Sequence, residues 1–357
     1  MIPLIFASNA RQFNTLGYGE LSESTRCEVF ESRNGEFTLE IDVPITARYF
    51  RLLNVGIFIV ADANETLKRQ AFEVYKVTKP LNGIVTAYAN HVSYRLKYSV
   101  LKPLNVTGAA AVFTALQSQS SAYYVEGNRF TFETDITSSA GIVTKDYHSV
   151  REVLGGIDGS ILDIFGGCFL WDNFKVKLCN NRGSDTGVRI VYGKNLKDIS
   201  VDYDNEEKFT AIYPYYKKSD GTFVVGTQIW RSVYDSNYTY HRTIAKSYND
   251  RFGSTTPTPA QLNAAAQADV NNAGLPDVSL DVDVIPLHTT IEYKSFAPLE
   301  RMQIDDTVRV YVPTLDVNVS AKVISTRYNV LLDRLQAVEI GNYRTTLADA
   351  IRALNNA

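Results

Sequence analysis

A chain of 357 residues with 45% hydrophobic and 21% charged side chains has the composition of a folded protein, and its length predicts two to four domains. The formal net charge of −3 excludes an overall basic surface that binds nucleic acid through its phosphates. With 3 cysteines, the chain also lacks the disulfide framework of a small secreted protein.

The N-terminal segment does not have the features of a signal peptide. It carries no basic leader, and Ser8 and Asn9 interrupt the apolar residues that follow Met1. No apolar run approaches the about 20 residues that a membrane-spanning helix needs. We therefore expect a protein that is made in a cytoplasm, carries no signal peptide and does not insert into a membrane.

The cysteines are expected to stay reduced. Cys168 and Cys179 flank a predicted hairpin whose turn falls at residues 172–173. That turn sets Cys168 opposite Lys177, so the two sulfur atoms would lie diagonally, which disfavours a disulfide. Cys27 begins another predicted strand. A cysteine peptidase needs a thiol activated by a neighbouring histidine, whereas cysteines in strands are more often structural.

Apolar and polar residues alternate with a period of two along much of the chain, which predicts strands. In the segment 37–43 the apolar residues occupy every second position. The same alternation recurs at 174–178, 188–192, 280–284, 308–312 and 315–319. The 22 tyrosines and 17 phenylalanines fit a β-rich chain, because aromatic side chains pack well on a pleated surface.

Helices are predicted at a few places by capping signals. The first follows Thr107 and buries Val112, Phe113 and Leu116. Three others begin at the capping boxes Ser149–Glu152, Thr258–Gln261 and Thr346–Asp349, and end at Gly155-Gly156, near Gly274 and close to Ala357. Isolated helices in a mostly β chain predict an α+β fold, not alternating β-α-β units.

Residues 50–96 and 300–346 show the same order of predicted elements: strand, loop, strand, turn, strand. The strands are expected at 55–60, 71–78 and 84–89, and again at 307–312, 317–326 and 335–340. Identity between the copies is weak, so two unrelated β-meanders would give the same pattern. If the repeat is genuine, the chain holds two equivalent barrels separated by insertions, and a ring of three chains presents six similar units.

Candidate catalytic and metal-binding residues do not gather into motifs. The four histidines, His91, His148, His241 and His288, are far apart, and none has a metal-ligand spacing. The motifs H-E-x-x-H, C-x-x-C and G-x-S-x-G do not occur. The sequence therefore predicts no catalytic, cofactor-binding or metal-binding residues, and no cofactor.

Three weaker signals have ordinary interpretations. Residues 155–160 resemble a phosphate loop but follow a helix and lack the Gly-Lys-Ser/Thr ending. Asp281 and Asp283 could ligate a cation, yet their alternation favours a solvated strand face. The tyrosine clusters at 213–216 and 234–240 could stack on cell-wall sugars if exposed, although buried strand aromatics are commoner.

Several short segments resemble the prophage endopeptidase tail family, the tail-associated lysin (Tal) or tail-tip hub proteins of long-tailed phages of Gram-positive bacteria. The segment 27–40, with Pro44 beyond it, resembles the family's N-terminal signature. Similar segments follow in the expected order at 70–75, 89–96, 154–156, 159–163, 166–167, 171–174, 181–183, 192–196, 305–308 and 338–341. Together they extend the resemblance over nearly the whole chain.

The resemblance implies a predominantly β, α+β protein that forms a homotrimeric ring at the virion tail tip. Two tube-like β-barrels, 1–98 and 196–218 with 289–345, would form a pseudo-six-fold ring. Two inserted domains, 99–195 and 219–288, would help close the channel until infection. The helix at 346–357 would lead to a lysin or tip module that is absent here, so we expect no enzymatic activity.

The resemblance also implies partners. The ring would dock on the distal tail protein and tail tube, pass the tape-measure protein and phage DNA, and hold a tail fibre or receptor-binding protein below. The DNA would pass without sequence-specific binding, so we predict a pore lined with acidic and neutral side chains. Assembly would take place in the host cytoplasm.

Two other functions stay open at this stage. One is an adhesin that binds host wall carbohydrate through the tyrosine-rich segments. The other is a cell-wall hydrolase, for which carboxylate pairs such as Asp202 and Asp204 are present but not placed across a sugar by any pattern. Family likeness alone does not distinguish a flexible from a contractile tail.

Overall fold

The computed structural model describes residues 1–79, 83–123, 130–192, 194–204, 209–253, 255–270, 277–284, 301–315 and 317–341. The chain folds into two compact units: unit 1 comprises Met1–Ser200 with Leu280–Ala357, and unit 2 comprises Val201–Ser279. Unit 2 is thus an insertion in the sequence of unit 1. The C-terminal helix predicted at 346–357 lies outside the described residues, as do residues 289–300 of the second predicted barrel.

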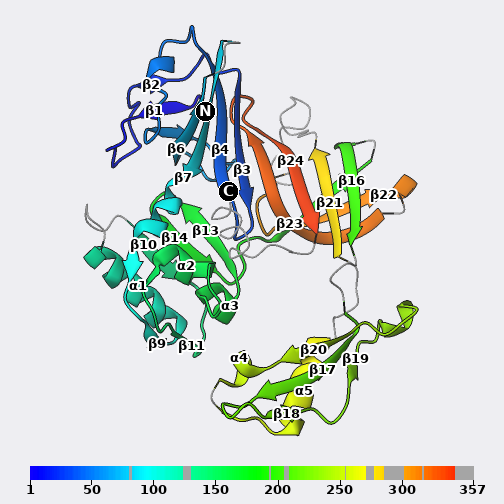
Figure 1. The fold of residues 1–357 in the computed structure, drawn as a ribbon. Helices are drawn as coiled ribbons and strands as arrows, with labels where there is room; N and C mark the ends of the chain where they lie inside the picture. Colours follow the sequence, from blue (N-terminus) through cyan, green and yellow to red (C-terminus); the bar gives the residue numbers. More distant parts are fainter. Residues whose placement is uncertain are drawn as a thin grey trace. The chain divides into compact units, whose positions relative to one another are not determined.

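Most of unit 1 is β-structure (Figure 1), as the alternation predicts. Its N-terminal part contains β1 (Leu4–Phe6), β2 (Gly19–Glu20), β3 (Arg26–Ser32), β4 (Phe37–Pro44), η1 (Phe50–Leu52), β5 (Phe58–Ala61), β6 (Gln70–Thr78), β7 (Ile84–His91) and η2 (Val92–Tyr98). Its last part contains β15 (Asp185–Val191), β16 (Leu196–Asp204), β21 (Asp277–Val284), β22 (Thr307–Val312), η6 (Pro313–Leu315), β23 (Val317–Asn329) and β24 (Arg334–Gly341). The predominantly β fold with few helices is confirmed.

One sheet of 13 strands runs through unit 1 in the order β16-β21-β24-β23-β3-β4-β7-β6-β5-β1-β2, with β22 beside β23 and β15 beside β22. The side chains of Leu39, Ile41 and Val43 in β4 are buried, and the polar residues between them lie on the opposite face. At β4 the sheet therefore has one apolar face, which forms the core, and one polar face.

The sequence repeat is a structural repeat. Strands β5, β6 and β7 form one antiparallel meander, and β22, β23 and β24 form another. Each meander continues through two further strands, β4 and β3 in the first repeat and β21 and β16 in the second. The described strands do not close a barrel in either repeat, because β3 pairs with β23 and joins both repeats into one open sheet.

A shared irregularity aligns the two repeats residue by residue. Val74 of β6 donates to the carbonyl of Ile57 at 2.9 Å and accepts from the N–H of Gly56 at 2.7 Å. Val323 of β23 makes the same two hydrogen bonds. It donates to the carbonyl of Asp306 at 2.9 Å and accepts from the N–H of Asp305 at 2.9 Å. Both strands are bulged directly after the valine. Val74 and Val323 are therefore equivalent positions.

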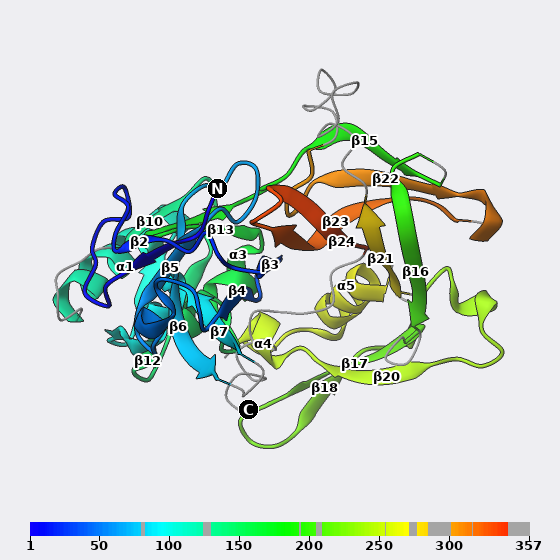
Figure 2. The same cartoon turned by 90° about the horizontal axis from the view of Figure 1, so that it is seen from above.

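The joint between the repeats lies along β3 and β23. These strands pair in antiparallel orientation, from Glu28 opposite Asn329 to Ser32 opposite Ser325. Two views of the molecule show β23 and β24 continuing the sheet beyond β3 (Figures 1 and 2). Backbone hydrogen bonding across this joint makes the two repeats one continuous sheet.

The middle part of unit 1 is an α+β insertion between the repeats. It contains β8 (Val100–Leu101), β9 (Asn105–Thr107), α1 (Ala109–Tyr123), β10 (Thr131–Thr134), β11 (Gly141–Val143), β12 (His148–Ser149), α2 (Val150–Gly155), α3 (Ile161–Phe165), β13 (Cys168–Asp172) and β14 (Lys175–Cys179). The capping box of Ser149 and Glu152 is confirmed, as is the burial of Val112, Phe113 and Leu116 on α1. Residues 155–160 end α2 and lead to a second capping box at Ser160.

The turn between β13 and β14 differs from the prediction. Asp172 pairs with Lys175, so the loop consists of Asn173 and Phe174, and Cys168 lies directly opposite Cys179. A shift of the turn by one residue moves the cross-strand partner by two, which places the cysteines face to face instead of diagonally. Both thiols are nevertheless free and buried.

Unit 2 is a small sheet covered by a helix. It contains β17 (Ala211–Lys217), β18 (Phe223–Val225), β19 (Trp230–Arg231), η3 (Asp235–Asn237), β20 (Thr243–Ser247), α4 (Asn249–Phe252) and α5 (Pro259–Val270). Ile212 and Tyr216 of β17 pack with Leu262 and Ala266 of α5 in the core. The predicted second barrel included residues up to 218, whereas β17 pairs with β18, β19 and β20 inside unit 2.

The start of α5 follows its capping signal. The N–H of Gln261 donates to the hydroxyl of Thr258 at 3.3 Å, and the side chain of Gln261 accepts from the N–H of Thr258 at 2.8 Å. This reciprocal pair is the capping box predicted from the sequence. Among the described helices, none has the length and apolar character that crossing a membrane requires.

Candidate assembly surface

The polar face of the large sheet carries a charge cluster on β3 and β4. Arg26 donates a hydrogen bond to Asp42 at 2.8 Å and another to Glu40, and its guanidinium lies 3.6 Å from Glu28. The strand register causes this grouping, because Arg26 is opposite Asp42 and Glu28 is opposite Glu40. One arginine therefore faces three carboxylates, which leaves this part of the face with net negative charge.

Hydrogen bonds keep this negative charge in place near neutral pH. Burial alone would raise the pKa of Asp42, but hydrogen bonds from Arg26 and Thr86 lower it below its ordinary value. Hydrogen bonds to Glu40 and Asp42 raise the pKa of Arg26, although burial opposes them. The cluster is thus a fixed array of charges on strands, not a set of mobile surface side chains.

The same face of the second repeat is also acidic at β21. Leu280 and Val282 are buried, so Asp281 and Asp283 project to the polar side between them. The ammonium of Lys197 in β16 lies 3.3 Å from Asp283. No cluster suited to a metal ion occurs in the part of the chain that the structure describes. Asp281 is exposed and Asp283 is paired with Lys197, so the two aspartates lie on a solvated strand face.

The turn between β3 and β4 contacts the middle part of unit 1 through the side chain of Asn34. The amide of Asn34 accepts a hydrogen bond from the N–H of Phe169 at 2.8 Å and donates one to the carbonyl of Gly167 at 3.0 Å. Asn34 is itself buried and has φ 55°, a left-handed conformation that asparagine tolerates better than most residues. The first repeat thereby holds the start of β13.

Asp305 ties the second repeat to the same turn. Its carboxylate accepts hydrogen bonds from Arg33 at 2.9 Å and Lys322 at 3.0 Å, and from the backbone N–H of Arg182 at 3.1 Å. Burial would raise the pKa of Asp305, but Lys322 and Arg33 lower it. Gly183 must be a glycine here, because a Cβ would lie 2.1 Å from the backbone carbon of Asp305.

A buried ion pair lies beneath this turn. The guanidinium of Arg182 is 2.7 Å from the carboxylate of Glu31, and both side chains are almost fully buried. Burial lowers the pKa of Arg182, but the charge of Glu31 and its hydrogen bond, together with the thiols of Cys168 and Cys179, leave the pKa raised. This ion pair holds β3 to the segment after β14. Loss of either Glu31 or Arg182 would destabilise the contact, because the remaining charge would be buried without a partner.

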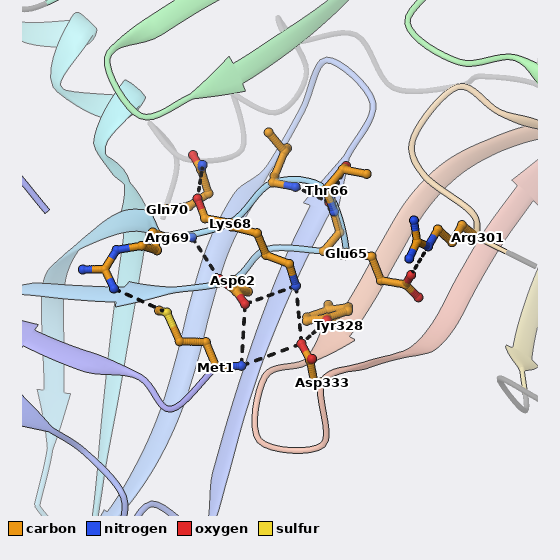
Figure 3. A network of polar contacts seen from close by, with 12 residues as sticks. Met1, Asp62, Glu65, Thr66, Lys68, Arg69, Gln70, Arg301, Tyr328 and Asp333 are labelled. Carbon is orange, nitrogen blue, oxygen red and sulfur yellow. Dashed lines mark hydrogen bonds and ion pairs between the residues drawn. The ribbon is translucent and has the colours of Figure 1, made fainter. Parts of the chain in front are cut away.

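A second polar contact between the repeats lies near the β23–β24 turn (Figure 3). The ammonium of Lys68, in the loop after β5, lies 3.2 Å from Asp62 and 3.5 Å from Asp333. Tyr328 donates a hydrogen bond to Asp333 at 2.6 Å, and the terminal ammonium of Met1 lies 3.6 Å from Asp62. Lys68 and Asp333 are well exposed, so this network orients the turn more than it stabilises the fold.

In the part of the chain that the structure describes, the histidines and cysteines do not gather into a catalytic site. His91 is buried against Gln70, and His241 contacts Asp235 in unit 2. His148 lies in the short strand β12, and His288 lies outside the described residues. Burial raises the pKa of the Cys168 thiol to about 11, and it raises the pKa of Cys27 and Cys179 as well. Such thiols are poor nucleophiles.

Neither the pocket beside Phe13 nor the tyrosine clusters indicate a catalytic site. A pocket of 370 Å³ beside Phe13 and Arg69 has no carboxylate, histidine or cysteine in its lining. In the tyrosine clusters, Tyr216 is buried in the core of unit 2, whereas Tyr213 and Tyr240 are exposed. The clusters are thus divided between packing and surface.

Comparison with known proteins identifies the second half of the chain. Residues 184–351 match the model of a family described as prophage endopeptidase tail. The resemblance to prophage tail proteins is confirmed. The matched segment contains the second repeat and unit 2, a shorter stretch than the sequence segments indicate. No curated protein matches the chain.

The whole chain is similar in fold to solved structures of prophage tail proteins. For gp18 from Listeria monocytogenes EGD-e, the identity is 13%, the match covers 100% of this chain and 99% of that one, and the TM-score is 0.58. For the tail protein from Neisseria meningitidis MC58, the values are 11%, 98%, 98% and 0.60. For the 43 kDa tail protein of prophage MuSo2 from Shewanella oneidensis, they are 10%, 89%, 94% and 0.56. Identities this low show the fold alone.

The sequence did not single out the residues that join the β3–β4 turn to the middle part of unit 1 and to the second repeat. The segments 27–40 and 305–308 stand out only through their resemblance to a family, and nothing local places Arg33 beside Asp305. The one signal in the sequence is Asn34-Gly35, a pair that favours a tight turn between two alternating strands.

Proposed function

We propose that this protein is the tail-tip hub of a phage or prophage, and that three copies form a ring between the tail tube and the tip. The family match supports a virion tail component. The observation that carries the finer proposal is the repeat, with Val74 and Val323 in equivalent positions. Three chains with two equivalent repeats each present six similar units, which suits a contact with a six-fold tube and its distal tail protein.

The polar face of the sheet would line the channel of this ring. Its opposite face is buried in the core of each repeat, so the polar face is the one left for water. Glu28, Glu40 and Asp42 around Arg26 give it negative charge, which repels phosphate and lets DNA pass without being retained. A lumen lined mainly by lysine and arginine in the assembled ring would contradict this assignment.

The two insertions suit a gate at one mouth of the channel. Unit 2 is inserted between β16 and β21, the counterparts of β3 and β4 in the first repeat. The corresponding turn of the first repeat, at Asn34, holds the middle part of unit 1. The connections of unit 2 and the contact that holds the middle part of unit 1 therefore fall at equivalent turns of the two repeats.

We further propose that this chain acts as a scaffold and not as a peptidoglycan-cleaving enzyme. The family description contains the word endopeptidase, whereas the similar solved structures are described as tail proteins. The poorly nucleophilic thiols and the separated histidines favour the scaffold. Clearing of cell-wall material by the purified chain in a zymogram would establish the hydrolase instead.

The hub assignment can be tested in the virion. Antibodies against the chain, coupled to gold, are expected to label the tail end distal to the head in electron micrographs. Deletion of its gene is expected to abolish finished infectious tails, because the proposed ring joins the tail tube to the tip. Labelling along the whole tail, or finished infectious tails without the chain, would rule out the hub.

Carbohydrate binding is a second candidate, favoured by the exposed rings of Tyr213 and Tyr240. Binding of the purified chain to cell-wall glycans on an array, lost in Tyr213→Ala and Tyr240→Ala, would support it. Replacement of the buried Tyr216 is not a suitable control, because it opens a cavity in the core of unit 2. An array without binding would remove this candidate.

A further inference from the structure

Cys168 and Cys179 form a facing pair at the end of the β13–β14 hairpin that lies away from its turn. They are direct partners in the antiparallel register, so both side chains lie on the same face of the hairpin. Opposite residues of an antiparallel pair have Cα atoms about 4.5–5.5 Å apart. Disulfides join cysteines whose Cα atoms are about 4.4–6.8 Å apart. The observed register therefore removes the diagonal placement that disfavours a bridge.

The third cysteine lacks such a partner. Cys27 lies opposite Ile41 of β4, and on its other side its carbonyl accepts a hydrogen bond from the N–H of Val330 at 2.9 Å. Both neighbours are apolar. Cys27 is as deeply buried as Cys168, at 0% exposure. It is therefore an internal control for chemistry that requires two facing thiols.

A buried guanidinium acts on both thiols of the pair. Burial raises the pKa of Cys168 and Cys179, but the positive charge of Arg182 acts in the opposite direction on each. The Nε and Nη2 atoms of Arg182 are buried, and they have no hydrogen-bond partner among the described residues. Disulfide exchange requires a thiolate, and a nearby cation favours that form. The pair thus combines a suitable spacing with a favourable charge.

We propose that Cys168 and Cys179 are a redox-active dithiol that closes to a disulfide once the protein has left a reducing cytoplasm. The oxidant is a small-molecule disulfide of the glutathione type. The thiolate of Cys179, at 5% exposure the more accessible sulfur, attacks this disulfide and displaces one thiolate from it. The thiolate of Cys168 then attacks the sulfur of Cys179 and displaces the other half. The two cysteines lose two electrons and two protons, and both halves of the oxidant leave as thiols.

The bridge would reinforce the point where the first repeat holds β13. Cys168 lies between Gly167 and Phe169, whose backbone groups are hydrogen-bonded to the side chain of Asn34. A bond to Cys179 would join this segment covalently to the end of β14. Because both sulfurs are buried, closure requires local opening of the strand ends and is slow compared with the reaction of an exposed thiol. The pair would stay reduced during assembly in the cytoplasm.

Intact mass spectrometry of the wild-type chain tests the bridge directly. The reduced chain is incubated with oxidised glutathione, then unfolded and alkylated. We expect a mass loss of about 2 Da before alkylation and one alkylated thiol in place of the three of the reduced chain. A linked peptide pair should contain Cys168 and Cys179, and dithiothreitol should restore all three thiols. Three alkylated thiols after prolonged incubation, or a bridge to Cys27, would overturn the proposal.

Two matched variants test the order of the reaction. Each removes one buried thiol, and circular dichroism verifies that each is folded. Cys27→Ala should form the bridge as the wild type does. Cys168→Ala should stop at the mixed disulfide of Cys179 with glutathione, because no second thiol is left to resolve it. A lasting glutathione adduct on Cys179 in the wild type would show that Cys168 does not reach it, and would refute the pairing. If Cys168→Ala does not fold, the wild-type measurement decides.

Hydrogen exchange tests the structural effect of the bridge. The amides of Phe169 and Asn180 are expected to exchange at least about tenfold more slowly in the oxidised than in the reduced chain. The amides of β4 serve as the reference, since this strand belongs to the first repeat. Equal exchange at Phe169 in the two states would refute the reinforcement of β13.

The cellular setting of the inference rests on the proposed tail protein, whereas the bridge itself follows from the register. Thiols are blocked by alkylation in intact producing cells and in released particles, and the linked peptides are then compared. We expect the pair to be open in the cells and closed in the particles. An open pair in released particles would refute the trigger and leave the tail-tip proposal intact. Gold labelling away from the tip would refute the hub and leave the disulfide intact.

Discussion

Asn34, at the tip of the β3–β4 hairpin, accepts a hydrogen bond of 2.8 Å from the backbone N–H of Phe169 in β13. The two residues are distant in sequence and belong to the first repeat and the middle insertion. Together with the bond from Asn34 to Gly167, this contact makes a hairpin turn the attachment point of another part of the fold. Its position matters for the proposed gate, because it holds an insertion at one end of the sheet.

Replacement of Asn34 is expected to destabilise unit 1. Asn34→Ala removes both hydrogen bonds and places at φ 55° an alanine, which tolerates this left-handed conformation less well than asparagine does. The expected loss in free energy of unfolding is about 2–3 kcal/mol, from unmet buried groups and backbone strain. Asn34→Gly is the matched control, since it loses the bonds but tolerates the conformation, and should cost about 1 kcal/mol less. Urea unfolding measures the free energy of unfolding of both variants. If Asn34→Ala were as stable as the wild type, the hydrogen bonds of Asn34 would not contribute to the attachment of β13.

The buried pair of Glu31 and Arg182 is expected to show strong coupling. Arg182→Met leaves the carboxylate of Glu31 buried without a counter-charge, which should cost about 3–5 kcal/mol of unfolding free energy. The double variant, with Glu31→Leu added, should be more stable than Arg182→Met alone. A double-mutant cycle from urea unfolding tests this. Additive effects of the two changes would show that the pair does not interact.

Acid should weaken the β3–β4 charge cluster. The folded pKa of Asp42 lies below its ordinary value of 3.8, so ionised Asp42 stabilises the fold fully above pH 3.8. That contribution is lost as the pH falls through the lowered pKa, because the proton breaks the hydrogen bond with Arg26. In Asp42→Asn the slope of stability against pH should be flatter between pH 5 and 2 than in the wild type. An identical slope would mean that Asp42 is not held by Arg26.

The thiols should be unreactive in the folded chain. Cys27, Cys168 and Cys179 are buried and free, and burial raises the pKa of each. We expect an aromatic disulfide reagent at pH 8 to modify all three in denaturant and none within minutes in buffer. Rapid reaction of one thiol would show that its strand opens. Absorbance of the released thiolate measures the number modified.

The parts of the fold that could be predicted are those that depend on local sequence patterns. The alternation in 37–43 and the capping boxes at Ser149 and Thr258 appear as expected, because they depend on neighbours within one strand or one turn. The repeat was also visible, since each meander is continuous in the sequence. These features require no knowledge of distant contacts.

Contacts that depend on a single turn residue or on distant segments could not be predicted. The hairpin at 172–174 offers two positions for its turn, and Asn173 with φ 51° selects the one that brings Cys168 opposite Cys179. The partnership of Arg33 with Asp305 spans most of the chain and follows from the β3–β23 joint. A joint between repeats leaves no local pattern, because each strand reads as an ordinary half-buried strand.

The oligomeric state of the purified chain tests the central claim most directly. The proposed ring predicts a mass three times that of the 39.9 kDa chain by light scattering over a concentration series. Dilution should convert this species to the monomer without a stable dimer, because two copies cannot close a ring of three. A chain that remains at 39.9 kDa up to its solubility limit would contradict the ring.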